Sequence, residues 1–252
     1  SHSFFPTALF AMPFAVLLTI LLVLAIDRSV FRFYRLNKSR PVIFVVASVG
    51  VMFMLNGLVR MLIGTDEIIF RDGQKFLIKA GQFKKMTGLN EGLALKQTQV
   101  LTVVLAVVAV FLLFWFLQRT RTGKAMRAYS DNEDLALLSG ISTERVVMVT
   151  WIIAASLATI AGVLYGLDKS FKPIVYFHLL LPIFASAIVG GIGQPVGAIL
   201  GGYIVAFSEI IATYAFKKFI TYIVPANFAP EGLGQLLSTE YKFAVSFLIL
   251  VL

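Results

Sequence analysis

The chain alternates long apolar runs with short polar and basic segments. Four runs have roughly the 20 residues that a helix needs to cross the hydrocarbon core of a bilayer. They cover residues 4–26, 41–63, 100–117 and 146–167. Because the runs are continuously apolar and do not alternate with polar residues, they indicate transmembrane helices and exclude a transmembrane β-barrel. The predicted fold class is an all-α polytopic membrane protein.

A fifth apolar region, 178–216, is interrupted. Pro182 breaks its first part, and the sequence Gly-Gly-Ile-Gly-Gln-Pro at 190–195 ends that part. The pieces are short for full spans, which predicts a re-entrant or half-length helix pair. Interrupted helices often line a transport pathway, because irregular backbone at membrane depth must face protein or water. Gly190, Gly191 and Gly193 are therefore candidate pathway residues.

Small residues recur on two helical faces, at the spacing that lets helix backbones approach closely in lipid. We predict tight helix packing near the pathway at both faces. The residues are Ala154, Ala158, Gly162 and Gly166 in the fourth run, and Gly197 and Gly201 after the glycine-rich break.

Glu209 is the acidic residue that lies well inside an apolar run. An ionisable group is costly at membrane depth, so Glu209 is a candidate pathway or ion-coupling residue. The alternative is a glutamate that hydrogen-bonds a neighbouring helix or lies near the interface.

Residues 119–145 form a basic, polar segment between the third and fourth runs. Ser130 and Glu133 have the spacing of a capping box, and Gly140 stands where a left-handed residue would end a helix. This pattern predicts a short helix over 131–139 with a small apolar face. Such a helix either docks on a partner or is an ordinary surface helix.

Composition supports the membrane assignment and excludes several kinds of chemistry. Of 252 residues, 59% are hydrophobic and 14% charged, whereas a water-soluble domain carries about 25% charged residues. With no cysteine and two histidines, the chain has no thiolate site, and its histidines cannot build a zinc site alone. No Walker A, Gly-x-Ser-x-Gly or His-Glu-x-x-His motif occurs. We expect no enzyme active site and no cofactor or metal bound by this chain.

The net charge of +9 lies mainly on residues that flank the apolar runs. This distribution fits topology signals and lipid contacts better than nucleic-acid binding. Basic residues are densest in 27–40 and 118–145, so the positive-inside rule places these segments in the cytoplasm and the loop 64–99 outside. The chain begins at Ser1 and stops inside an apolar run, which we interpret as part of a longer protein that lacks segments at both ends.

Several stretches resemble the LivH-type permease subunits of branched-chain amino acid ABC transporters. They are T-R-T-G-K-A-M-R-A at 120–128, D-L-A-L-L-S-G-I at 134–141, A-A-S-L-A-T-I-A-G-V-L-Y-G at 154–166, V-G-G-I-G-Q-P-V-G-A-I-L-G-G at 189–202, A-F-S-E at 206–209 and E-Y-K-F-A-V-S-F-L-I-L-V-L at 240–252. Residues 1–118 are similar mainly in hydropathy. The family's N-terminal pore motif and its C-terminal tail lie outside this chain.

The resemblance implies the transmembrane domain of an ABC importer in the bacterial cytoplasmic membrane. Residues 131–139 would be a cytoplasmic coupling helix that inserts into a LivG- or LivF-like ATPase subunit, which would hold ATP and magnesium. A LivM-like permease or a second copy would complete the pathway, and a substrate-binding protein would meet the loops 64–99 and 217–242 outside. The positions carried over for ATPase docking are Gly123, Arg127, Ala128, Ala136, Leu138, Gly140 and Ile141.

Two alternatives stay open. A permease of the same architecture could import urea or short amides. A different class, an ion-coupled secondary transporter, would use Glu209 and would need no ATPase. It would lose transport on Glu209→Gln but not on damage to 131–140. A membrane scaffold is disfavoured, since a scaffold needs no discontinuous helix.

Overall fold

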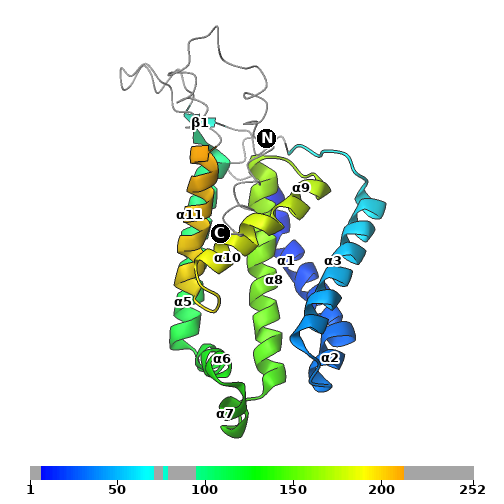
Figure 1. Cartoon of the computed structure of the whole chain (residues 1–252). Coiled ribbons are helices and arrows are strands. Elements are labelled where there is room, and N and C mark those ends of the chain that lie inside the picture. Colours follow the sequence, from blue (N-terminus) through cyan, green and yellow to red (C-terminus); the bar gives the residue numbers. More distant parts are fainter. Residues whose placement is uncertain (1–6, 71–75, 79–94, 213–252) are drawn as a thin grey trace, which may run out of the picture. The chain divides into compact units, whose positions relative to one another are not determined.

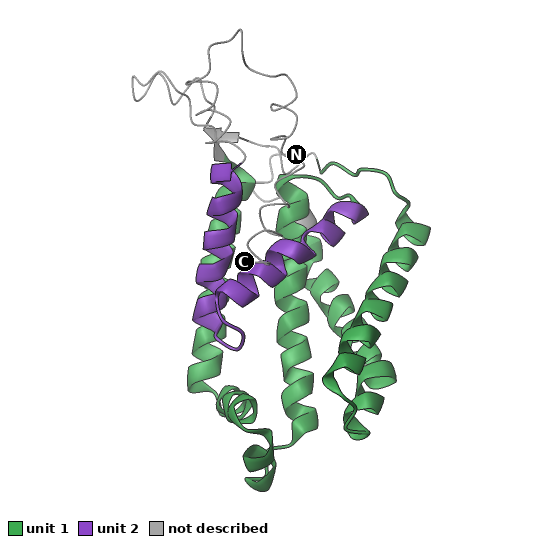
Figure 2. Cartoon of the chain, viewed as in Figure 1, with its two compact units in different colours: residues 1–172 green, residues 173–252 purple. Residues whose placement is uncertain are grey.

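The computed structural model describes residues 7–70, 76–78 and 95–212. The chain divides into two compact units, Ser1–Lys172 and Pro173–Leu252, which Figure 2 distinguishes by colour. Each unit is described by itself.

The first unit contains the long apolar helices. Its elements are α1 (Thr7–Ile26), η1 (Asp27–Phe31), α2 (Arg32–Leu36), α3 (Pro41–Ile63), β1 (Phe76–Ile78), β2 (Leu95–Lys96), α5 (Gln97–Arg119), α6 (Arg121–Asp131), α7 (Glu133–Leu138) and α8 (Thr143–Asp168). Among the described residues, four helices are long and apolar enough to cross a membrane: Leu9–Leu36, α3, α5 and α8. The four predicted spans are therefore confirmed, although residues 4–6 of the first lie outside the described chain.

The first helix continues well beyond its apolar run. The run ends at Ile26, but the π-helical turn η1 and the helix α2 carry the helix on to Leu36. The chain then turns at Lys38, which has a φ of 47°. Pro41 occupies the first turn of α3, where its missing N–H has no helical partner to lose. Much of the basic segment 27–40 is thus helix and not loop.

The helix α1 packs along α8, as Figure 1 shows. Ala155, Leu164 and Leu167 of α8 are buried, as is Phe31 of η1. Elsewhere the long helices expose large apolar side chains, such as Phe14 of α1 at 71% and Phe111 of α5 at 68%. Such extended apolar faces are unfavourable in water but are favourable against lipid tails.

The two ends of α8 contact different polar segments of the chain. Its 26 residues span about 39 Å, enough to separate the two faces of a membrane. At its start, Glu144 pairs with Arg32 of α2. At its far end, Asp168 pairs with Lys96, and Phe171 forms an antiparallel bridge with Ile68. The prediction that 27–40 and 118–145 lie on the same side of the membrane agrees with the Arg32–Glu144 contact.

The second unit contains α9 (Pro173–His178), α10 (Leu180–Val189) and α11 (Pro195–Ile210). Residues 190–194 between α10 and α11 are not helical, and within the described residues the two helices have 10 and 16 residues, so the predicted interruption of the fifth region is confirmed. Pro182 lies in the first turn of α10. Because proline has no N–H, it cannot bond to the carbonyl of His178, and α9 ends at that residue. The loop 217–242 lies outside the described residues.

Candidate functional site

The segment 119–145 folds as two consecutive helices, α6 and α7, at the end of α5 (Figure 1). Thr120 begins α6, because its Oγ1 accepts a hydrogen bond from the Gly123 N–H at 3.0 Å. Gly123 itself is buried. A Cβ at that position would overlap backbone atoms of Phe116 and Leu117 in α5. The structure therefore places Gly123 in the close α5–α6 turn and not on an exposed docking face.

The start of α7 differs from the prediction. The capping box of Ser130 and Glu133 is wrong, because α6 continues through Ser130 to Asp131. Asn132 is the residue that caps α7: its backbone is extended, with φ −156° and ψ 107°, and its Oδ1 accepts from the Leu135 N–H at 3.0 Å. The helix is correspondingly shorter than predicted, Glu133–Leu138 instead of 131–139. Three neighbouring residues could cap a helix here, and spacing alone does not choose among them.

The end of α7 agrees with the prediction. Gly140 has a φ of 81°, the left-handed conformation that glycine adopts without steric cost. The Gly140 N–H donates to the Leu137 carbonyl and the Ile141 N–H donates to the Ala136 carbonyl, both at 3.0 Å. These two bonds form a Schellman motif, which satisfies carbonyls that the helix leaves free.

The apolar residues of α7 divide into a buried and an exposed set. Ala136 is buried, whereas Leu135, Leu137 and Leu138 are 60%, 46% and 85% exposed. Three exposed leucines on one short helix, beyond the apolar length of α5 and α8, are an unusual feature that suits contact with a partner. Of the other docking candidates, Arg127, Ala128 and Gly140 are exposed and Ile141 is half-buried.

A hydrogen bond joins α6 to α7. The Tyr129 hydroxyl donates to Glu133 Oε1 at 2.6 Å. Burial, together with the neighbouring Glu133 carboxylate, raises the pKa of the Tyr129 phenol. The phenol therefore stays protonated and keeps its ability to donate at neutral pH.

Glycines bring α10 and α11 into backbone contact. A Cβ at Gly190 would overlap the carbonyl group of Gly197, and a Cβ at Gly201 would overlap the carbonyl oxygen of Ser186. Gly191 and Gly193 both have a φ of 88°, so they make the turn between the helices. The predicted close packing at Gly197 and Gly201 is thus present within the second unit. A role of these glycines in the pathway remains a prediction.

The small residues of α8 do not form one buried face. Gly166 is buried and Gly162 half-buried, but Ala154 and Ala158 are exposed. The face that packs in the first unit contains Ala155 instead. A role for Ala154 and Ala158 near a pathway therefore needs a contact beyond the described residues of this unit.

Glu209 is half-buried near the end of α11.

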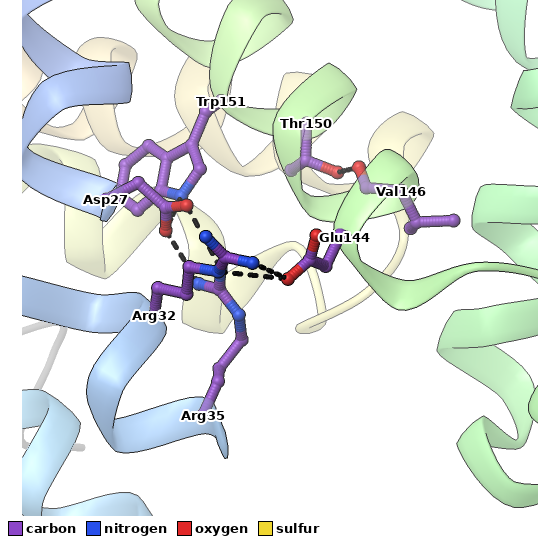
Figure 3. Close-up of polar contacts among 7 residues, drawn as sticks. All are labelled: Asp27, Arg32, Arg35, Glu144, Val146, Thr150 and Trp151. Atoms are coloured by element: carbon purple, nitrogen blue, oxygen red, sulfur yellow. Dashed lines mark hydrogen bonds and ion pairs between the residues drawn. The ribbon is translucent and has the colours of Figure 1, made fainter. Parts of the chain in front are cut away.

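A polar cluster that the sequence analysis missed joins the end of α1 to α8 (Figure 3). Arg35 donates to both carboxylate oxygens of Asp27, at 2.6 and 3.0 Å, and Trp151 Nε1 donates to Asp27 Oδ1 at 2.8 Å. Beside it, Arg32 donates twice to Glu144 Oε1, at 2.9 and 2.7 Å. The eight-residue spacing of Asp27 and Arg35 is a signal for one helical face, but only if 27–36 is recognised as helix.

The same region contains a cleft of about 520 Å³ between the end of the first helix and the start of α8. Asp27 and Glu144 lie in its wall with four arginines, which are Arg28, Arg32, Arg35 and Arg145.

No metal site is found in the described part of the chain. Residues 7–70, 76–78 and 95–212 contain no group of three or more histidine, aspartate or glutamate side chains that could hold an ion.

The long apolar helices and the short glycine-packed hairpin define a polytopic α-helical membrane protein. A sequence profile described as branched-chain amino acid transport system / permease component matches residues 1–252. The chain therefore belongs to this permease family, which confirms the resemblance drawn from its motifs. It is a multi-pass protein of the cytoplasmic membrane, and the family is one of transport-system permease components.

Individual relatives agree with the family. The chain is 28% identical over 229 residues to the high-affinity branched-chain amino acid transport system permease protein LivH of Escherichia coli K12, covering 90% of this chain and 65% of that protein. It is 37% identical over 112 residues to a probable LivH protein of Methanocaldococcus jannaschii, covering 44% and 35%. It is also 27% identical over 166 residues to the fructose import permease FruG of Bifidobacterium longum, covering 63% and 48%. No solved structure matches the chain.

Proposed function

We propose that the chain is the permease subunit of an ATP-driven importer for branched-chain or related amino acids, in which it forms part of the translocation pathway. The observation that carries this proposal is the family match over all 252 residues. The chain spans 65% of the length of the LivH relatives, so the activity of the whole protein is part of the proposal.

The proposal assigns α7 to a separate ATPase subunit. Its support is the capped helix with leucines 60%, 46% and 85% exposed, which a groove on a partner would cover. The ATPase would bind ATP and magnesium, since the sequence has no Walker A motif. A second permease and an extracytoplasmic substrate-binding protein complete the proposed assembly. ATP-driven closure of the ATPases would then rock the paired permeases between outward- and inward-facing states.

The docking role of α7 can be tested with Leu138→Glu in the full-length protein. A carboxylate at a site that becomes apolar on docking must be desolvated, so the co-purifying ATPase subunit should be lost. Leu36→Glu is the matched control: Leu36 is 69% exposed and ends α2, on the same side as the start of α8. Size-exclusion chromatography of both variants shows whether the permease is still folded.

Retention of the ATPase by Leu138→Glu, or its equal loss in Leu36→Glu, would contradict the coupling role of α7. The substrate is tested in the same assembly by uptake of labelled leucine against labelled urea, acetamide and fructose. Fructose belongs in the panel because one relative is a fructose import permease. Uptake of leucine that requires ATP and survives Glu209→Gln distinguishes the proposal from an ion-coupled transporter.

A further inference from the structure

The cleft at the start of α8 carries an excess of positive charge. Four arginines line it, and two carboxylates, Asp27 and Glu144, lie in the same wall. Asp27 binds Arg35 through both of its oxygens, and Glu144 binds Arg32. No carboxylate of the described residues forms an ion pair with Arg28 or Arg145. The cleft therefore retains two positive charges, on Arg28 and Arg145, that are available to an anion.

One wall of the cleft is held by hydrogen bonds between the first helix and α8. Trp151 Nε1 and the Arg35 guanidinium fix the Asp27 carboxylate from two helices. The Phe31 and Trp151 rings also contact each other, with centroids 5.7 Å apart. Because these contacts already order this wall, binding of an anion costs less side-chain conformational entropy.

The level of the cleft along the membrane normal indicates which kind of anion it binds. The apolar run of α1 ends at Ile26, and that of α8 begins at Val146. Arg28 and Arg145 thus lie just outside the hydrocarbon boundary, and Leu24 and Met148, which also line the cleft, lie just inside it. A tryptophan near this level is typical of the membrane interface. Phospholipid phosphates lie at the same depth, and their acyl chains begin immediately below it.

We propose that this cleft binds the headgroup of an anionic phospholipid. Arg28 and Arg145 contact the phosphate, and Leu24 and Met148 contact the first carbons of an acyl chain. Arginine suits this role because its planar guanidinium presents paired N–H groups to phosphate oxygens. A soluble phosphate would use the arginines but would gain nothing from the apolar wall. The proposal does not depend on which substrate the protein transports.

The test uses the purified full-length protein in a neutral detergent. Dioleoylphosphatidylglycerol is titrated against dioleoylphosphatidylcholine and inorganic phosphate, and bound lipid is counted by native mass spectrometry while the unfolding midpoint is followed. Phosphatidylglycerol should bind and raise the midpoint, whereas phosphatidylcholine and inorganic phosphate at equal concentration should not. The Arg28→Gln/Arg145→Gln double variant should weaken phosphatidylglycerol binding about tenfold or more, since each surface charge contributes about fivefold.

Two further variants keep the test decisive. Arg40→Gln/Arg119→Gln removes the same charge from exposed positions at the same end of the helices but outside the cleft, and should keep full affinity. Arg28→Lys/Arg145→Lys should restore most of the binding. Equal binding of both lipids, unchanged affinity in the glutamine double variant, or an equal effect of inorganic phosphate would each overturn the proposal.

Discussion

At the scale of single residues, Asp27 organises the contact between the first helix and α8. Its carboxylate accepts hydrogen bonds from Arg35, eight residues away, and from Trp151, 124 residues away. The side chains of Asp27 and Arg35 are 13% and 22% exposed. The neighbouring pair of Arg32 and Glu144 is 36% and 62% exposed, so water screens it more strongly.

The two ion pairs should therefore differ in their effect on stability. Asp27→Ala leaves the Arg35 and Trp151 donors without an acceptor, and we expect the free energy of unfolding to fall by roughly 2 kcal/mol. Glu144→Ala should cost less than about 1 kcal/mol, as is usual for an exposed pair. Unfolding of the purified protein in detergent, followed by tryptophan fluorescence, measures both. If Glu144→Ala lowered the free energy of unfolding as much as Asp27→Ala does, the hydrogen bond from Trp151 to Asp27 would add nothing to stability.

At the scale of elements, glycine determines how α10 and α11 pack. The hairpin brings the backbones together at Gly190, Gly197 and Gly201, where even a methyl group would overlap main-chain atoms. Gly202 is adjacent in sequence, but a Cβ there meets no atom within 4 Å. Close backbone approach through small residues is a principal way for helices to associate in lipid, where the hydrophobic effect does not drive them together.

This contrast predicts opposite effects for two neighbouring substitutions. Gly197→Ala should separate α10 from α11 and lower the unfolding midpoint, at a cost of at least about 1–3 kcal/mol for overpacking. Gly202→Ala should be neutral or slightly stabilising, because alanine favours a helix over glycine by about 1 kcal/mol. Thermal unfolding of the two variants in detergent provides the comparison. Equal midpoints would mean that the hairpin is not packed through this face.

At the scale of the whole molecule, the long helices separate two polar ends of the first unit. Charge density predicts that the segments 27–40 and 118–145 lie in the cytoplasm. The Arg32–Glu144 ion pair joins these segments at one end of α8. At the other end of α8, Ile68, which belongs to the loop predicted to lie outside, forms a bridge with Phe171. Which end faces the cytoplasm remains a prediction from charge.

The absence of cysteine makes this orientation directly measurable. Single cysteines at exposed positions, Ser139→Cys in the α6–α7 segment and Lys169→Cys at the far end of α8, can be labelled with a membrane-impermeant maleimide. In intact cells only Lys169→Cys should react, and Ser139→Cys should react after the membrane is opened. The unsubstituted chain, which has no thiol, provides the background. The reverse pattern would show that the protein has the opposite orientation.

Local physics was enough to determine the spans, the break and the end of α7 from the sequence. A continuous apolar run must form a helix in lipid because its backbone groups need internal partners. The left-handed turn at Gly140 follows from a conformation that glycine adopts freely. The cap at Asn132 was missed because Ser130 and Asn132 compete for the same role within three residues.

Only the tertiary structure decided which distant groups meet. The contact of Asp27 with Trp151, the burial of Gly123 against α5 and the choice of Ala155 over Ala154 on the packed face of α8 depend on how helices lie against each other. Hydrophobic periodicity is weak on a helix that is apolar all round, so it does not say which face meets protein and which meets lipid. The arginine cleft also depends on which helix faces meet, so it is recognised only when α8 lies beside the end of the first helix.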